Sequence, residues 1–308
     1  MHYIKLNMVK LISLLVFSLF SLYISAFIDF SSNSIFFQDD TDTYCKTELI
    51  EKSRIKSPVN IGYYNSDGTM VFPGNPHFVL DRTFYKRVNG VKFEFKDKKL
   101  SNDENDPSYK DLEMDITGIG YAYVKLYNQT YKYNPKTLRL RVFSEHTFEK
   151  TKMDMEIQIM HELSSDITNN KLPQRIGLAV LFSIARNKKS SFVDDFIGKD
   201  EKFNDETTRY NFALTKSLDL NQFFNFWEPY YYYEGSGTSP EDYCKRVDWF
   251  VMKKVQNMSQ EQLRQIQLIL SHEGYPHGFA KQLEKNLKDG NPEHRIYYHP
   301  NVEPEDDE

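Results

Sequence analysis

Polar and apolar residues alternate along several segments of this chain, and a period of two is typical of β-strands with one buried face. In residues 137–142, for example, Arg139 and Arg141 fall on one face, while Leu138 and Leu140 fall on the other. The segments that the pattern predicts as strands are 121–126, 137–142, 155–161 and 176–184.

The last of these strands differs from the others in its pattern, and two further segments predict helices. Residues 176–184 form a continuous apolar run, as a strand buried on both faces requires. Residues 187–217 hold many charges and predict one short helix with loops. A longer helix is predicted over residues 259–270, because Ser259 followed three positions later by Gln262 has the form of a capping box.

Two more segments complete the expected architecture. Residues 96–111 are nearly all charged or polar and include Pro107, so we expect an exposed loop there. We expect the aromatic run at residues 223–233 in the core and in the wall of a cavity, with an exposed contact surface as the alternative. Many strands with few helices indicate a mainly β fold, with a mostly antiparallel sheet and peripheral helices.

The beginning of the chain has the composition of a targeting segment. Lys5 and Lys10 precede an apolar run that ends in small residues. We interpret residues 1–26 as a signal peptide, which implies the secretory pathway and a secreted or cell-surface protein. The alternative is a signal anchor, retained over residues 11–28, which would tether the protein to a membrane.

The bulk composition indicates one large domain. The chain has 308 residues, of which 40% are hydrophobic and 15% aromatic, enough for a substantial core. We assign this domain to residues 44–300, between a polar tether at residues 27–43 and an acidic tail at residues 301–308. The formal net charge of -5 argues against nucleic acid as a partner.

Several short motifs occur in a fixed order along the chain. They are Ser57-Pro58-Val59-Asn60-Ile61, Asn89-Gly90-Val91-Lys92-Phe93, Ser144-Glu145-His146-Thr147, Gly177-Leu178-Ala179-Val180-Leu181, the run from Tyr231 to Pro240, Val247-Asp248-Trp249-Phe250-Val251 and Ser259-Gln260-Glu261-Gln262-Leu263. In this order and spacing they resemble the α-class carbonic anhydrases, over most of the chain. The resemblance implies a large, twisted, mostly antiparallel sheet with small peripheral helices.

The same resemblance implies a zinc enzyme, but the residues at the zinc positions do not suit the metal. The family's three histidine ligands, two in an H-x-H pattern and one on the next strand, fall on Arg139, Arg141 and Gln158. Guanidinium groups have no acceptor and stay protonated, and a single amide oxygen suits zinc poorly. We therefore predict no zinc, no other cofactor, no catalytic residue and no hydration of carbon dioxide.

Other positions of the family's site keep their chemical character. Glu145 and Thr238 match an acid and the threonine that donates to it, and Glu156 matches the carboxylate that orients the third histidine. We interpret all three as buried hydrogen-bond partners that are kept for the fold. The family's proton-shuttle position falls on Val91, which cannot relay a proton.

The two arginines supply the same positive charge as a zinc ion. We expect Arg139 and Arg141 to pair with Glu145 and Glu156 and so to plug the former metal site. The alternative is an anion-binding pocket, in which the two arginines and Thr238 hold a small carboxylate or sulfate.

Three functions are consistent with these residues. The resemblance implies a catalytically silent carbonic-anhydrase-like protein that binds another protein or a glycan through its surface. A residual anhydrase or esterase would need replacement ligands, but we expect the nearby His146 and His161 to be buried structural residues. The third reading is a small-anion binder that uses Arg139 and Arg141.

A secreted protein would also carry covalent modifications. Cys45 and Cys244 lie close to positions that are bridged in secreted members of the family, so the resemblance implies a disulfide, with two free thiols as the alternative. The bridge would close a loop of about two hundred residues, worth ~4–5 kcal/mol on the chain-entropy model. Asn128 and Asn257 lie in N-glycosylation acceptor sequences, either of which can remain unused.

Overall fold

The computed structural model describes residues 57, 59–61, 71–73, 78–89, 94–99, 108–167, 172–197, 217–224, 228–238, 245–271 and 296–299. All of them belong to one unit of the chain, Thr47–Glu308. Some predicted features lie outside the described residues: the N-terminal targeting segment, the tether, the acidic tail, Val91, Cys45 and Cys244.

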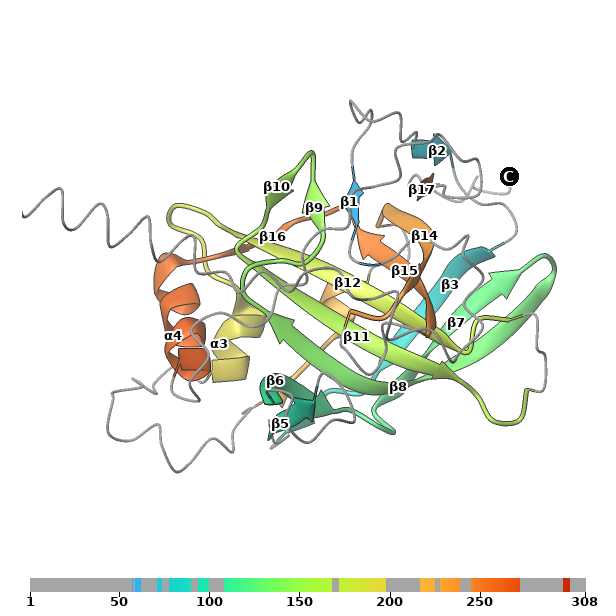
Figure 1. The fold of residues 1–308 in the computed structure, drawn as a ribbon, viewed down its shortest axis with the longest axis horizontal. Helices are drawn as coiled ribbons and strands as arrows, with labels where there is room; N and C mark the ends of the chain where they lie inside the picture. Colours follow the sequence, from blue (N-terminus) through green and yellow to red (C-terminus); the bar gives the residue numbers. More distant parts are fainter. Residues whose placement is uncertain are drawn as a thin grey trace, which may run out of the picture. The chain divides into compact units, whose positions relative to one another are not determined.

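Strands dominate the described residues, so the predicted mainly β fold is confirmed (Figure 1). The main sheet has the strand order β2 (Val71–Pro73), β17 (Ile296–His299), β14 (Tyr230–Ser236), β15 (Arg246–Met252), β12 (Arg175–Ile184), β11 (Met155–Leu163), β8 (Gln129–Arg141), β6 (Ser108–Asp115) and β5 (Glu94–Lys99). Three strands branch from this path: β7 (Gly120–Leu126) on β8, β3 (Phe78–Tyr85) on β7, and β16 (Gln256–Met258) on β12.

Two small sheets accompany the large one. One contains β1 (Asn60–Ile61), β9 (Thr147–Phe148) and β10 (Thr151–Lys152), and the other pairs β4 (Val88–Asn89) with β13 (Ser217–Leu218). In the large sheet β8, β11 and β12 are antiparallel neighbours, whereas β12 runs parallel to β15 and β16. The sheet is therefore mixed, although antiparallel pairs prevail around the centre.

The two predicted helices are present and short: α3 (Ser191–Ile197) and α4 (Gln260–Ser271). A 3₁₀ turn that was not predicted, η1 (Asn221–Phe223), accompanies them. The capping box of α4 is confirmed, because the Ser259 N–H donates to Gln262 Oε1 at 2.9 Å and the Gln262 N–H donates to Ser259 Oγ at 3.1 Å. Among the described helices, none is long and apolar enough to cross a bilayer.

The two faces of the main sheet differ in chemistry. One face packs Leu138, Leu140, Ile157 and Ile159 into the larger core, which also holds Phe192 of α3 and Leu263 of α4. The aromatic run contributes to both sides, because Phe223, Tyr230 and Tyr232 belong to the larger core and Tyr231 and Tyr233 belong to the smaller cluster. All five are buried, so the predicted core placement is confirmed for these residues. The opposite face combines a smaller apolar cluster around Trp249 with the polar residues of the candidate site.

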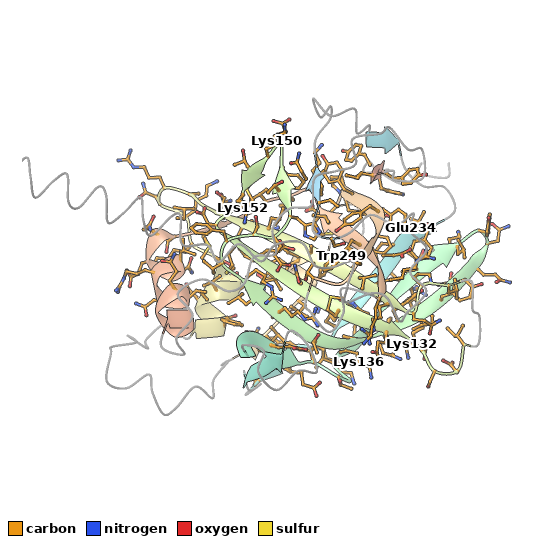
Figure 2. All side chains as sticks on the ribbon, viewed as in Figure 1. Lys132, Lys136, Lys150, Lys152, Glu234 and Trp249 are labelled. Atoms are coloured by element: carbon orange, nitrogen blue, oxygen red, sulfur yellow. The ribbon has the colours of Figure 1, made fainter. Side chains whose placement is uncertain are left out.

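One glycine of the smaller cluster is required by its neighbour. A Cβ atom on Gly177 of β12 would lie 2.5 Å from the ring of Trp249, which packs over it from β15. Figure 2 shows Trp249 among these strands. The Trp249 indole N–H donates to the Ser236 carbonyl oxygen at 2.8 Å, so the ring is held by packing and by a hydrogen bond.

The prediction of a loop over residues 96–111 is wrong at both ends of that segment. Residues 94–99 and 108–115 form β5 and β6, which pair with each other, and β6 also pairs with β8. Charged side chains misled the pattern because β5 lies at the end of the main strand order, where charged residues discourage further strand pairing.

Candidate functional site

The candidate site occupies the polar face where β6, β8 and β11 lie side by side. The register places Glu113 opposite Arg139 and Arg139 opposite Gln158, and it places Arg141 opposite Glu156. All five side chains are almost completely buried. A strand sends alternate side chains to the same face, so this cluster follows directly from the register.

Arg141 is fixed by an acid from its own segment. Its Nε donates to Glu145 Oε1 at 3.0 Å, and both side chains are buried. The second oxygen of Glu145 accepts from Gln158 Nε2 at 2.6 Å, and Gln158 Oε1 accepts from the Thr238 hydroxyl at 2.8 Å. Arg141, Glu145, Gln158 and Thr238 therefore form one continuous network, which includes the predicted Arg141–Glu145 pair.

Glu156 is bound differently from the prediction, which paired it with an arginine. Its Oε2 accepts from the backbone N–H groups of Glu145 and His146 at 2.7 and 2.9 Å, and its Oε1 accepts from Gln158 Nε2 at 3.0 Å. The ring Nδ1 of His146 lies 2.6 Å from the same Oε1. Because the partners of Glu156 come from the turn after β8, its side chain reaches them before it reaches an arginine.

The protonation of Glu156 follows from these contacts. Burial alone would raise the pKa of the Glu156 carboxyl, but the charge of His146 and the hydrogen bonds outweigh it and hold that pKa below its usual range. The carboxylate is therefore the acceptor, and His146 Nδ1–H donates to it.

The network extends from His146 to Ser57, the first described residue of the chain. His146 Nε2 lies 2.7 Å from the Tyr233 hydroxyl, which in turn lies 3.0 Å from Ser57 Oγ. Ser57 is also tied to β14, because its N–H donates to Ser236 Oγ at 3.0 Å. This chain of contacts joins residues more than 170 positions apart (|i−j| = 179), which gives the polar face a structural role in the fold.

Arg139 has surroundings that differ from those of Arg141. It borders a cavity of about 200 Å³ that also reaches Thr137 and Met160. Among the residues that the structure describes, the other charged ones that line this cavity are Glu113, Lys136, Glu162, Arg175 and Lys245. The two arginines thus share a face of β8, but Arg141 bonds Glu145 and Arg139 borders the cavity. Alternation along a strand cannot reveal this difference.

His161, at the other end of β11, is held as a neutral ring. Its Nδ1 lies 3.1 Å from the Ile159 carbonyl oxygen, which can only accept, so Nδ1 carries the proton. Nε2 is then the acceptor for the Tyr85 hydroxyl at 2.8 Å. Burial lowers the pKa of His161 to about 3, in agreement with this neutral state.

These side chains do not fit a zinc ion. Two of the three positions expected for ligands carry guanidinium groups, and both polar atoms of the Gln158 amide are engaged with Glu145, Glu156 and Thr238. The buried His146 and His161 use both ring nitrogens within the fold. No group of three metal-binding side chains is formed by the described part of the chain.

Some site residues were missed from the sequence. Thr137 and Met160 share the parity of Arg139 and Gln158 on their strands, so alternation could have found them. Glu113 was not found, because no strand was predicted over residues 108–115, and Lys245 was not found, because it precedes β15 and is brought to the site by tertiary structure. The side chains of Asn128 and Asn257 are exposed, and their glycosylation stays a prediction.

The fold is that of a carbonic anhydrase scaffold, and its described side chains form no zinc-binding group. The sequence profile of the eukaryotic-type carbonic anhydrase family matches residues 84–296, so the chain belongs to that family. Among curated relatives, dioscorin DB3L from Dioscorea polystachya is 29% identical over 135 residues, which cover 43% of this chain and 44% of dioscorin. The match therefore spans less than half of that relative.

Solved structures show the same fold at low sequence identity. A crystal structure of dioscorin complexed with ascorbate has a TM-score of 0.54 at 19% identity, and it covers 81% of this chain and 87% of dioscorin. A halotolerant carbonic anhydrase from Dunaliella salina has a TM-score of 0.56 at 14% identity, over 81% of this chain and 89% of that enzyme. At these identities the comparison establishes the architecture alone.

Proposed function

We propose that this protein is a catalytically silent member of the carbonic anhydrase family, which acts as a binding protein of the secretory pathway. The observation that carries the proposal is the closed network at the former metal site. Arg141 and Gln158 engage Glu145, Glu156 and Thr238 in a buried arrangement that needs no metal for its charge balance. Arg139 adds a second guanidinium group to the same face.

Metal analysis and activity assays test the loss of catalysis together. We expect the purified mature protein to contain no stoichiometric zinc and to hydrate carbon dioxide no faster than buffer. Zinc content is measured by elemental analysis after dialysis against zinc, and hydration is measured by stopped flow. About one zinc per chain together with matching hydration activity would contradict the proposal.

A ligand-restoring variant tests the same idea in the opposite direction. The triple change Arg139→His, Arg141→His and Gln158→His places three imidazoles on the same face of β8 and β11. We expect this variant to take up about one zinc per chain. A matched control with Arg139→Gln and Arg141→Gln removes the same charge without adding imidazole, and zinc uptake by this control would show that the new histidines are not the ligands.

The secretory assignment rests on residues 1–26 and on the two cysteines. N-terminal sequencing of protein secreted from a eukaryotic host tests cleavage, and recovery of the intact N-terminus in the membrane fraction would favour the retained anchor instead. Alkylation before and after reduction, read by intact mass, tests the Cys45–Cys244 bridge. Two freely alkylated thiols in the native secreted protein would refute it.

The expected partner is a protein or a glycan that binds the surface. A pull-down with the secreted domain, followed by mass spectrometry and a glycan array, tests this directly. The triple-histidine variant serves as a control, because its buried changes leave a surface partner bound to the same extent. A partner that is lost with the buried changes would place binding in the old cavity rather than on the surface.

A further inference from the structure

The strands β3, β7 and β8 lie side by side, and their outer face carries aromatic rings together with cations (Figure 1). The alternate residues of β7 are buried in the larger core, so this face points away from the core. The aromatic–cationic face consists of Arg82 and Phe84 on β3, Tyr121, Tyr123 and Lys125 on β7, and Lys132 on β8. Figure 2 shows Lys132 on its strand.

The rings of this face contact one another and the cations. The ring centroids of Phe84 and Tyr121 lie 5.5 Å apart, and those of Tyr121 and Tyr123 lie 4.8 Å apart. The guanidinium carbon of Arg82 lies 4.9 Å from the Tyr123 centroid, and Lys132 Nζ lies 5.4 Å from the Tyr121 centroid. These contacts hold the cations beside the rings, and they leave little ring surface for a ligand that binds by stacking, such as a sugar.

Phe84 and Lys125 are the side chains of this face that are most open to a partner. Phe84 is 47% exposed and adjoins two tyrosines that are themselves partly exposed, and contiguous patches of this kind mark contact sites. Lys125 is exposed and forms no ion pair within the described part of the chain. Aromatic rings beside an arginine, with a lysine at the border, have the composition of a contact surface for another protein.

The charges on this face select the kind of partner. Asp81 lies 3.7 Å from the Nε of Arg82, and Asp166 lies near enough to Lys132 for their charges to interact. Both contacts are open to solvent, where ion pairs contribute little, so a carboxylate of a partner can replace either acid. With Lys125, the face offers three exposed or half-buried cations, which makes it complementary to an acidic partner.

We propose that the aromatic–cationic face binds an acidic peptide segment of a partner protein. The carboxylates of that segment meet Arg82, Lys125 and Lys132, and an apolar side chain beside them packs on Phe84. The hydroxyl groups of the two tyrosines can donate further hydrogen bonds to the carboxylates. This inference rests on the proposed function, because it gives a surface and a partner class to a protein that acts by binding.

Fluorescence anisotropy with a defined peptide tests the proposal on the full mature chain. The labelled probe is a short peptide in which aspartates and glutamates surround one leucine; one analogue replaces the acids by amides, and another replaces the leucine by serine. We expect saturable binding of the probe, about tenfold weaker binding of the amide analogue and about threefold weaker binding of the serine analogue. Added salt should weaken the probe more than the amide analogue, because it screens exposed charges. Equal affinity of these two peptides would overturn the proposal.

Variants locate the peptide on this face. Phe84→Ser should weaken binding of the probe about tenfold, and Lys125→Gln, which changes an exposed side chain, about threefold. The matched controls are Phe143→Ser, at a phenylalanine that is 42% exposed, and Lys188→Gln, at another exposed lysine; each should leave the affinity within about twofold. Denaturation midpoints check that all four variants fold. Equal losses in the test and control variants would overturn the proposed surface.

Two other occupants of the face give different results. Dextran sulfate that binds the protein and is weakened by Phe84→Ser and Lys125→Gln, without binding of the peptide, would assign the face to an acidic glycan. A dimer in sedimentation experiments that Phe84→Ser dissociates, without binding of the peptide, would assign the face to a second copy of this chain. Either result would overturn the proposal.

Zinc content and hydration of carbon dioxide are measured on the same preparation. Zinc-free, inactive protein that does not bind the peptide overturns this inference alone and leaves the proposed function intact. Stoichiometric zinc with matching hydration activity overturns the proposed function, whatever the peptide does. The two failures are therefore read from separate measurements.

Discussion

The two faces of the central sheet are stabilised by different interactions. On the face of Leu138 and Leu140, side chains from β8, β11 and the two helices exclude water by packing alone. On the face of Arg139 and Arg141, buried charges are matched by acids, an amide and a histidine through specific hydrogen bonds. The first face depends on volume and the second on partners, so they should respond differently to the same kind of perturbation.

The comparison also shows how the buried acids of the polar face are satisfied by side chains and backbone groups. Glu145 and Glu156 remain buried, and without hydrogen-bond partners each would destabilise the fold by several kcal/mol, in order of magnitude. Arg141 donates to Glu145, whereas two backbone N–H groups, Gln158 and His146 donate to Glu156. The polar face thus retains a structural purpose that does not require catalysis.

The largest effect is expected from removing one charge of the buried pair. Arg141→Met leaves Glu145 buried without its cation, which should lower the free energy of unfolding by about 3–5 kcal/mol. The double variant Arg141→Met with Glu145→Gln should recover most of this loss, because no lone charge remains. Chemical denaturation measures both.

A matched exposed pair gives the control for this change. Arg264 of α4 bonds Glu261 on the surface, and Arg264→Met should leave the denaturation midpoint unchanged within error. An Arg141→Met protein as stable as the wild type would show that the polar face does not depend on charge pairing.

The apolar face should respond to volume and not to charge. Leu140→Ala removes a buried side chain from the larger core and should cost about 3 kcal/mol through lost packing and a residual cavity. Leu140→Met nearly conserves volume and should cost less than about 1.5 kcal/mol. The loss in Leu140→Ala should be the same at pH 8 and pH 5; a strong pH dependence would contradict the separation of the two faces.

The histidines of the site sharpen the comparison through pH. The folded protein keeps His161 neutral, with a pKa of about 3, whereas the unfolded chain takes up a proton as pH falls through about 6.5. Stability due to this group is therefore complete above that range and lost toward acid, by about 2 kcal/mol at pH 5. Glu156, whose pKa is lowered, adds its own loss of stability at more acidic pH, as pH falls from the usual carboxyl range toward that lowered pKa.

Denaturation curves at pH 7 and pH 5 test this assignment. His161→Gln keeps an acceptor for the Tyr85 hydroxyl but cannot titrate, so the difference in stability between the two pH values should shrink by about 2 kcal/mol. An unchanged pH dependence in this variant would assign the effect to other groups.

The smallest effect is expected at the edge of the network. Thr238→Val keeps the shape of the side chain but removes the donor to Gln158 Oε1, at a cost of about 1 kcal/mol. Thr238→Ser retains the hydroxyl and should lie between this variant and the wild type. If Thr238→Val is as stable as the wild type, the hydroxyl is not needed to orient the amide.

The sequence by itself determined the elements with strong local signals. Local patterns identified β7, the end of β8, β11 and the continuously apolar β12, and the capping box placed the start of α4, because these signals depend on residues a few positions apart. The residue types alone also showed that Arg139 and Arg141 cannot bind zinc, since guanidinium groups have no lone pair to offer.

Only the tertiary structure decided which partner each buried charge takes. In the structure, the charged segment around Lys96 forms a strand, and Glu156 bonds His146. Arg139 lies beside a cavity, whereas Arg141 bonds Glu145. These outcomes depend on the register between strands that are distant in sequence. Alternation fixes the face of a side chain, but the distance to its partner is set by the neighbouring strand, which no local pattern specifies.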